Sequence, residues 1–181
     1  FYDLTFVCFN KKNLIGNGFL IPAGPLRQNL NSLKRYKNIF LNGNDEDVFS
    51  IKPLFSKGGE NLKFFEAEYQ PINLKDFDLK NSYIAFSGIG NHSTFIDMLN
   101  KFKFKIIYDF EFPDHYAYKI NDIKKIYLLA KNNNAKILTT EKDFFRLTDV
   151  DKKEIKYIKT YLKIKDLEKI RQKLNIFDEN F

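Results

Sequence analysis

The sequence predicts an α/β protein with two lobes, and two observations carry most of that prediction. From about residue 79, short apolar segments rich in β-branched and aromatic residues alternate with segments of helical character, as in a parallel sheet covered by helices. Before that point lie two further strand-like segments and a loop rich in Gly and Pro. We therefore expect an N-terminal lobe over 1–47, a two-stranded β-ribbon linker over 48–78 and a C-terminal α/β lobe over 79–181.

The N-terminal lobe begins with LTFVCF (4–9), whose length and composition predict a buried strand. The loop GNGFLIPAGPLR (16–27) follows, and LRQNLNSLKRY (26–36) predicts a helix. NIFLNG (38–43) predicts a second short strand that ends at its glycine, and the acidic residues 44–47 mark a boundary.

The linker is expected to be a hairpin. SIKPLF (50–55) and NLKFFEAEYQPINL (61–74) flank SKGGE, in which Gly58-Gly59 suits a tight turn. Because two strands without further partners are marginally stable, we expect this ribbon to join the two lobes.

The C-terminal lobe alternates strands with helices. The expected strands are YIAFSG (83–88), KIIYDFEF (105–112), KILTT (136–140) and EIKYIKTYLKI (154–164). The expected helices are STFIDMLNKF (93–102), IKKIYLLAKN (123–132), EKDFFRL (141–147) and DLEKIRQKL (166–174).

Composition narrows the classes of function. The net charge of +7 favours anionic partners such as phosphates, nucleic acid or an acidic membrane surface, although a lysine-rich solvated surface explains it equally well. The basic residues are spread along the chain, which weakens the nucleic-acid interpretation. The single cysteine, Cys8, excludes an internal disulfide and a cysteine-built metal site, and its apolar neighbours predict that it is buried.

No run of about 18 apolar residues predicts a membrane span. The chain begins with Phe1 and its only methionine is Met98, so we expect it to be the later part of a longer protein.

The loop around Gly24 is the first candidate for a ligand site. Pro22 and Pro25 restrict the backbone, while Gly24 permits conformations that a side chain forbids. Arg27 follows where a helix is expected to begin, and a guanidinium beside free backbone N–H groups suits a phosphate. The alternative is a structural turn with a surface arginine.

Two further loops follow predicted strands, at the sheet edge where ligands gather in open α/β folds. FSGIGNHS (86–93) has a glycine turn before a helix, but it lacks a Walker A motif and a full G-x-G-x-x-G, so a tight packing turn is the alternative. EFPDHYAY (111–118) places Asp114 and His115 at a strand tip, where a histidine could exchange protons. A structural or simply exposed histidine is the alternative, and His92 is the only other one.

ILTTEKDFFRL (137–147) ends another predicted strand. Thr140 and Asp143 fit a capping box, which accounts for both residues without a function. Lys142 lies in the first helical turn, where a cation opposes the helix dipole, and this placement hints at a ligand.

The four blocks PAGPLR, AFSGIGN, FPDHYAY and TTEKDFFRL, in that order, resemble the tetraacyldisaccharide 4'-kinase (lipid A 4'-kinase) family over most of the chain. The resemblance implies a partial P-loop, Rossmann-like lobe followed by the ribbon and a smaller parallel-sheet lobe. It also implies transfer of the γ-phosphoryl of ATP, with Mg²⁺, to the 4'-hydroxyl of an acylated glucosamine disaccharide 1-phosphate. The resemblance further implies that the reaction takes place at the cytoplasmic face of the inner membrane of Gram-negative bacteria, whose anionic surface would suit the positive charge.

The resemblance also suggests roles for individual residues. His115 matches the family's FPDH histidine, which partners an upstream Asp in activating the hydroxyl, and Arg27 matches an arginine near the nucleotide phosphates. Gln28 stands where the family usually has Glu, so metal binding is in doubt, and His92 stands where the family usually has Pro. Asp114 and Lys142 are candidates on the substrate side.

In the family, the Walker A loop, the catalytic Asp and the acidic metal-binding motif all precede the part of the sequence that this chain resembles. This chain is therefore expected to be inactive alone and to need an N-terminal kinase segment.

Two other functions stay open. The first is a non-catalytic remnant that binds anionic glycolipid or a membrane surface through the basic, apolar-striped segment 159–174, although its leucines and isoleucine also have ordinary core spacing. The second is a basic nucleic-acid-binding domain, which lacks a recognisable motif. We expect no nucleic-acid partner.

Overall fold

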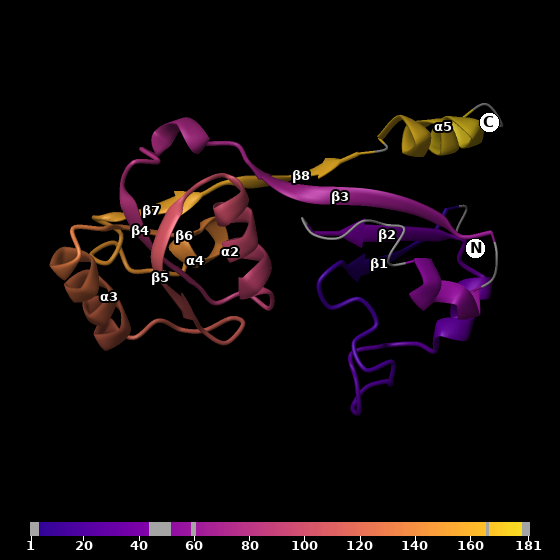
Figure 1. Ribbon diagram of the computed structural model, residues 1–181, viewed down its shortest axis with the longest axis horizontal. Helices are drawn as coiled ribbons and strands as arrows, with labels where there is room; N and C mark the ends of the chain where they lie inside the picture. Colours follow the sequence, from indigo (N-terminus) through magenta and orange to yellow (C-terminus); the bar gives the residue numbers. More distant parts are fainter. Residues whose placement is uncertain (1–3, 44–51, 59–60, 166, 179–181) are drawn as a thin grey trace. The chain divides into compact units, whose positions relative to one another are not determined.

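A computed structural model describes residues 4–43, 52–58, 61–165 and 167–178 (Figure 1). The chain forms two compact units, one containing Phe1–Tyr69 and Leu162–Phe181 and the other containing Gln70–Tyr161. The boundaries predicted after residues 47 and 78 stay a prediction. Within the described ranges, no helix is both long enough and apolar enough to cross a bilayer.

The first unit is built on a four-stranded sheet in the order β1-β2-β3-β8. Its strands are β1 (Phe6–Asn10), β2 (Asn38–Asn42), β3 (Lys63–Pro71) and β8 (Thr160–Ile164). β2 runs parallel to both β1 and β3. The 3-10 helices η1 (Leu30–Lys34) and η2 (Lys52–Gly58) and the helix α5 (Leu167–Asp178) complete the described part of the unit.

One hydrophobic cluster of the first unit lies on the face of this sheet that η2 covers. Ile39 and Leu41 of β2 are fully buried there, together with Phe55 of η2. The ring of Phe55 packs edge-on against Phe9 and Phe64, with centroid distances of 4.8 and 5.8 Å. These contacts hold η2 against the sheet.

Two predicted elements of the first unit differ in the structure. Residues 26–36 were expected to form a helix, but only the short η1 forms, with Asn29 accepting a hydrogen bond from the Asn31 N–H at its start. The expected strand at 50–55 is wrong, because residues from Lys52 onward form η2 and bury Phe55. Gly59, in the expected hairpin turn, lies outside the described residues.

In the sheet, β3 pairs with β2 on one side and with β8 on the other. The backbone N–H of Lys165 donates to the carbonyl of Glu66 at 2.8 Å, and that of Ile72 donates to the carbonyl of Lys159 at 2.9 Å. The chain passes from one unit to the other along these same two strands, β3 and β8.

Cys8 is exposed, so the prediction that it is buried is wrong. Side chains alternate along a strand. Val7 and Phe9 of β1 pack against the core, and Cys8 between them points to the opposite side.

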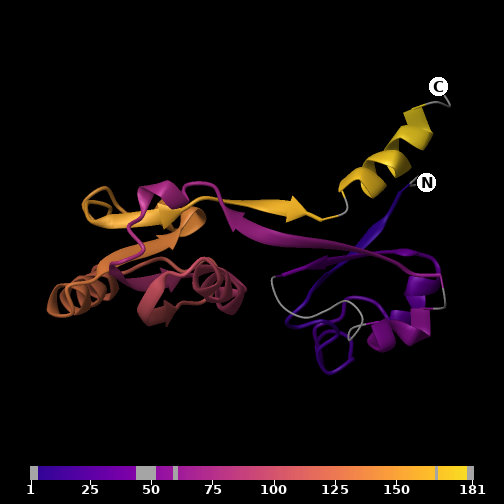
Figure 2. The same cartoon turned by 45° about the horizontal axis from the view of Figure 1, so that its top comes forward.

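The second unit contains a fully parallel four-stranded sheet in the order β5-β4-β6-β7 (Figures 1 and 2). Its strands are β4 (Ser82–Ser87), β5 (Lys105–Glu111), β6 (Lys136–Thr140) and β7 (Ile155–Ile158). The helices are η3 (Leu74–Asp76), α2 (His92–Lys101), α3 (Ile120–Asn132) and α4 (Glu141–Phe144). The predicted α/β class with parallel sheets is confirmed.

Helices α2 and α3 lie on opposite sides of this sheet (Figure 1). Ile84 and Phe86 of β4 pack in one buried cluster with Ile123 and Ile126 of α3. Tyr83, which precedes Ile84, points to the other side, where its ring meets Phe104 at a centroid distance of 5.3 Å. A central strand buried on both faces explains why YIAFSG is almost uninterruptedly apolar.

The segment EIKYIKTYLKI was expected to be one strand, but the structure divides it into β7 and β8, which belong to different sheets. The break falls at Lys159, whose backbone N–H donates to the side chain of Asn73 at 2.9 Å. The Asn73 amide also donates to the carbonyl of Tyr157 at 3.0 Å. Asn73 therefore hydrogen-bonds to backbone groups at the point where the chain leaves one sheet for the other.

Candidate functional site

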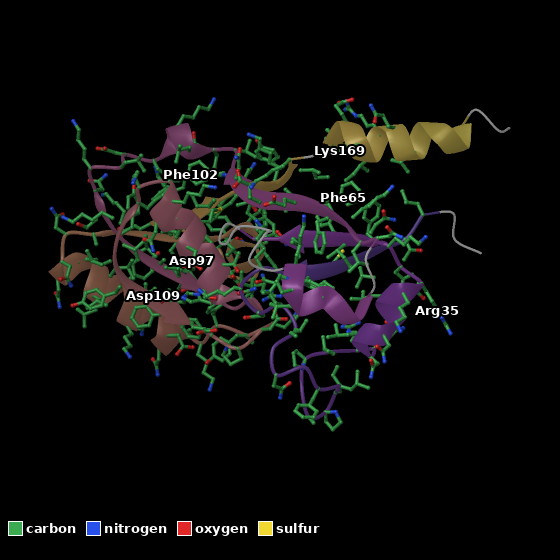
Figure 3. The ribbon with its side chains drawn as sticks, turned by 45° about the vertical axis from the view of Figure 1, so that its right-hand side comes forward. Arg35, Phe65, Asp97, Phe102, Asp109 and Lys169 are labelled. Carbon is green, nitrogen blue, oxygen red and sulfur yellow. The ribbon has the colours of Figure 1, made fainter. Side chains whose placement is uncertain are left out.

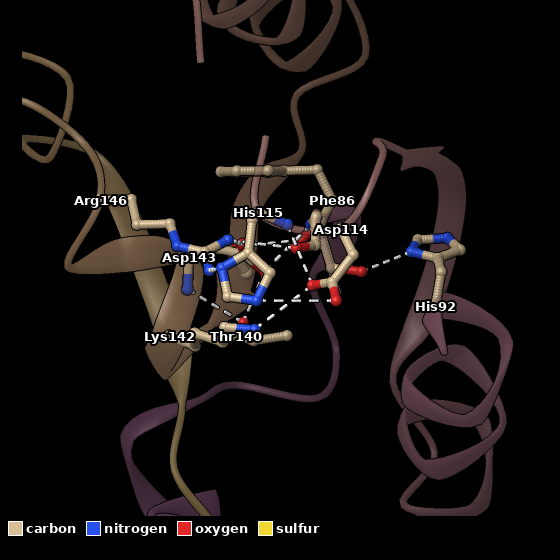
Figure 4. A network of polar contacts seen from close by, with 11 residues as sticks. Phe86, His92, Asp114, His115, Thr140, Lys142, Asp143 and Arg146 are labelled. Carbon is tan, nitrogen blue, oxygen red and sulfur yellow. Dashed lines mark hydrogen bonds and ion pairs between the residues drawn. The ribbon is translucent and has the colours of Figure 1, made fainter. Parts of the chain in front are cut away.

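Three loops meet at the carboxyl edge of the second sheet, as expected for the loops that follow β4, β5 and β6 (Figure 4). The side chains and backbone groups that form a connected polar network there are called the carboxyl-edge cluster. Its members are Gly88, Asp114, His115, Thr140, Lys142, Asp143 and Arg146.

The carboxylate of Asp143 is the buried centre of this cluster. It is fully buried and accepts hydrogen bonds from the Gly88 N–H at 3.1 Å, the Thr140 hydroxyl at 2.6 Å and Arg146 Nη1 at 3.3 Å. The Thr140 oxygen in turn accepts from the Asp143 N–H at 3.1 Å, so the predicted Thr140 cap is confirmed. Asp143 does more than the capping pattern suggested, because it also links α4 to the loop after β4.

Gly88 packs closely against Pro113 and Tyr118. A Cβ at this position would lie 3.1 Å from the carbonyl oxygen of Pro113 and 3.1 Å from the Tyr118 hydroxyl. That hydroxyl is itself buried, and among the described residues it makes no hydrogen bond of good geometry. Burial and the nearby negative charge of Asp143 raise the pKa of Tyr118, so the phenol stays neutral.

His115 stands at the solvent side of the cluster, with about 72% of its side chain exposed. Its backbone has a φ of 62°, in the left-handed region that non-glycine residues rarely adopt. The His115 N–H donates to the Gly88 carbonyl at 3.2 Å, and the ring Nδ1 lies 2.9 Å from Arg146 Nη2. The backbone and the ring are therefore both held while the other edge of the imidazole remains open.

Asp114 and Lys142 form an ion pair beside this ring. Lys142 Nζ lies 3.3 Å from Asp114 Oδ1, and Asp114 Oδ2 lies 3.7 Å from His115 Nε2. Desolvation opposes ionisation of Asp114, but the hydrogen bond from Lys142 and the charges of His115 and Lys142 lower its pKa. The structure thus brings together three residues that the sequence had singled out, His115, Asp114 and Lys142.

His92 has a structural environment. Its ring is 4% exposed, with Nδ1 2.7 Å from the Ser87 hydroxyl and Nε2 2.9 Å from the carboxylate of Asp109, which is labelled in Figure 3. The order Ser–His–Asp resembles a hydrolytic triad, but Ser87 is fully buried and cannot reach a substrate. His92 ties the start of α2 to β4 and β5.

Arg27 and Gln28 belong to the first unit, apart from the unit that holds His115. Both are exposed and line a cleft of about 550 Å³, together with polar residues from β1 and its following loop such as Asn10 and Asn13. Exposed guanidinium and amide donors on a cleft wall are chemically suited to a phosphate.

The loop that carries Arg27 is held in shape by its own backbone. The Ile21 N–H donates to the Leu26 carbonyl at 2.9 Å, and the Leu26 N–H donates to the Phe19 carbonyl at 3.1 Å. A Cβ on Gly24 would lie 2.5 Å from the backbone carbonyl oxygen of Phe19 and 2.1 Å from the Asn17 side-chain oxygen, so only glycine fits. The structure therefore supports the expectation of a preorganised loop.

The described residues do not supply a metal site. Nowhere in the described ranges do three His, Cys, Asp or Glu side chains gather closely enough to hold an ion. Gln28 offers a neutral amide in place of a carboxylate.

Sequence reasoning missed Arg146 and the central position of Asp143. The signal for Arg146 was its spacing, since it lies one helical turn after Asp143 and the two side chains can meet. Its contact with His115, 31 residues away, depends on the parallel order of the strands and has no local signature.

Comparison with known proteins gives consistent results. The sequence profile of the tetraacyldisaccharide-1-P 4'-kinase family matches residues 2–176. A tetraacyldisaccharide 4'-kinase of Pelagibacter ubique (strain HTCC1062) is 48% identical over 173 residues, covering 96% of this chain and 55% of that protein. A second one, from Rickettsia bellii (strain OSU 85-389), is 39% identical over 148 residues, covering 81% of this chain and 44% of that protein.

A solved structure has the same fold. It is the crystal structure of the "apo" form of LpxK from Aquifex aeolicus in complex with ATP, with a TM-score of 0.56 and 23% identity, covering 96% of this chain and 52% of that one. The chain thus spans about half the length of the curated relatives that it matches.

Proposed function

The chain belongs to the tetraacyldisaccharide-1-P 4'-kinase family, and from this premise we propose that it is part of an enzyme that phosphorylates the 4'-hydroxyl of a tetraacyldisaccharide 1-phosphate with ATP. The observation that carries the proposal is the presentation of His115. Its ring is held by Arg146, its backbone by Gly88, and its free edge faces solvent at the carboxyl end of the sheet. Phosphoryl transfer asks the protein mainly for such positioning and for electrostatic stabilisation.

In this reaction the carboxyl-edge cluster would meet the sugar. His115 would partner a carboxylate from outside the chain in activating the hydroxyl, as the family resemblance implies. The exposed Lys142 ammonium and the Asp114 carboxylate would orient polar groups of the disaccharide, because both are placed beside the ring without being buried.

Arg27 and Gln28 would contact the phosphates of ATP. The exposed guanidinium on the wall of a preorganised cleft supports this role, since it can offer two parallel donors to a phosphate. The described residues do not fit a Mg²⁺ site by themselves, so the ion would need carboxylates from elsewhere in the enzyme.

The protein would work at the cytoplasmic face of the inner membrane. Its charge of +7 supports attraction to an anionic surface. The helix α5 adds a specific observation, because Leu167 and Leu174 are 39% and 49% exposed while Ile170 between them is buried. These features also support the second candidate, a non-catalytic piece that binds anionic glycolipid.

Two preparations test the kinase proposal. One is this chain alone, and the other is a chimera in which the segment preceding the matched region of the Pelagibacter ubique relative is joined to residue 1. We expect the chimera to transfer labelled phosphate from ATP to the 4'-hydroxyl, and the chain alone to transfer none. A folded chimera that binds ATP but leaves the disaccharide unphosphorylated would contradict the proposal.

Vesicle co-sedimentation tests the second candidate with the chain alone. Vesicles containing anionic phospholipid should retain it, and retention should fall as salt is raised. Equal binding to neutral vesicles would rule out the electrostatic attraction.

A further inference from the structure

We propose that Arg146 is a positioning residue for His115, which occupies Nδ1 of the imidazole and thereby places the proton of the neutral ring on Nε2. The proposal rests on a contact between two loops that are distant in sequence, with 2.9 Å between Arg146 Nη2 and His115 Nδ1 (Figure 4).

The chemistry of the two groups decides which one donates. A guanidinium has five N–H donors and no acceptor, and it does not lose its proton in proteins. The Nδ1 atom in this contact must therefore be the acceptor with a lone pair. A neutral imidazole carries one proton, so that proton is on Nε2.

Of the two side chains, Arg146 is held in place by its own contacts, and it orients the ring of His115. The arginine side chain is only 23% exposed, and Nη1 donates both to Asp143 at 3.3 Å and to the Gly88 carbonyl at 3.2 Å. The His115 ring is 72% exposed, so water would otherwise leave it free to turn. Asp143 is fully buried and is held by Thr140 and by the Gly88 N–H. Arg146 thus connects the exposed ring of His115 to the fully buried carboxylate of Asp143.

The opposite edge of the ring is consistent with a proton on Nε2. Asp114 lies on that side, with a carboxylate oxygen 3.7 Å from Nε2. Under the proposed function, on which this consequence rests, His115 meets the reacting groups as an N–H donor. While Arg146 occupies Nδ1, the acceptor of the hydroxyl proton is a group other than His115.

The unmodified chain provides the first test. The sequence has two histidines, so ¹⁵N spectra of the imidazoles contain two ring systems, and His92 with its Ser87 and Asp109 contacts is an internal reference. In mildly alkaline buffer we expect His115 to show an unprotonated Nδ1 and a protonated Nε2. A proton on Nδ1 of His115 would overturn the proposal, because the guanidinium could not then donate to it.

The second test compares variants by their rate of modification with diethyl pyrocarbonate, which attacks an imidazole lone pair. Although His115 is largely exposed, the parent chain should react slowly at this residue. In Arg146→Gln the rate should rise about tenfold, the change that the loss of one such hydrogen bond implies. Arg146→Lys, which retains a cationic donor, should restore part of the protection.

Two controls separate positioning from unfolding. His92 is 4% exposed and should stay unreactive in every folded variant. Arg171→Gln removes an exposed arginine–carboxylate pair in α5 and should leave the His115 rate unchanged. An unchanged His115 rate in Arg146→Gln, with His92 still protected, would overturn the proposal.

If His92 becomes reactive in Arg146→Gln, that variant has lost its folded structure. The proposal is then tested by which ring nitrogen of His115 carries the proton in the ¹⁵N spectrum of the parent chain. Neither measurement requires phosphoryl transfer, so the proposal can fail or hold independently of the kinase function.

Discussion

Replacing Asp143 is the most informative test of the carboxyl-edge cluster. In Asp143→Ala, the Gly88 N–H, the Thr140 hydroxyl and Arg146 all lose a fully buried acceptor. Breaking a buried pair of this kind costs about 3–5 kcal/mol of unfolding free energy. Asp143→Asn keeps one oxygen, which can serve the Gly88 N–H and Thr140, but its amide N–H₂ would face Arg146. We expect Asp143→Asn to lower the unfolding free energy by about 1.5–3 kcal/mol, the value of one hydrogen bond to a charged group.

Because the chain has two compact units, one unfolding curve need not report on the cluster alone. Hydrogen exchange at the Gly88 amide reports on it directly. A local loss of about 3 kcal/mol corresponds to roughly 100-fold faster exchange. Asp149→Ala is the matched control, since Asp149 is a fully exposed carboxylate paired with Lys152 at the same i,i+3 spacing. If Asp143→Ala and Asp149→Ala exchange at Gly88 equally slowly, the central role of Asp143 is refuted.

Three further predictions concern stability. Glu66 contacts the buried Lys11 at 2.5 Å and Lys165 at 3.0 Å, and these lysines lower its pKa from the ordinary 4.5 although desolvation opposes them. The contribution of Glu66 to the unfolding free energy is therefore present above about pH 4.5 and is lost as the pH falls through the lower pKa of the folded state. The unfolding free energy of Glu66→Gln should therefore depend less on pH in this acid range. Tyr118→Phe removes an unpartnered buried hydroxyl and should change unfolding free energy by less than about 1 kcal/mol; a loss above about 2 kcal/mol would reveal a missing hydrogen bond. Gly24→Ala should destabilise the first unit by about 1–3 kcal/mol through overpacking against Asn17, measured by urea unfolding, and an unchanged midpoint would contradict the close approach.

The sequence predicted the second unit well because its signals are local. Strands such as YIAFSG are buried on both faces, so an apolar run identifies them, and Thr140 caps its helix within three residues. The loops after β4, β5 and β6 were expected at one edge of the sheet, and the parallel pairing places them there. His115, Asp114 and Lys142 follow from that topology.

The errors arose where tertiary contacts decide. Phe55 turns its segment into a 3-10 helix because it fills the space beside Phe9 and Phe64, which no local pattern announces. The break between β7 and β8 falls at Lys159, where the backbone N–H donates to Asn73, 86 residues away in the sequence. Arg146 meets His115 for a similar reason.

The most direct test of the central claim, that His115 acts in phosphoryl transfer, is the single-turnover rate of the chimera with and without this side chain. We predict that His115→Ala lowers the rate of 4'-phosphorylation by about 10²–10⁴-fold, the usual contribution of a positioned acid–base group, while ATP binding is retained. Asp149→Ala, which removes an exposed carboxylate paired with Lys152, should leave the rate unchanged. A folded His115→Ala chimera that phosphorylates the disaccharide as fast as its parent would contradict the claim.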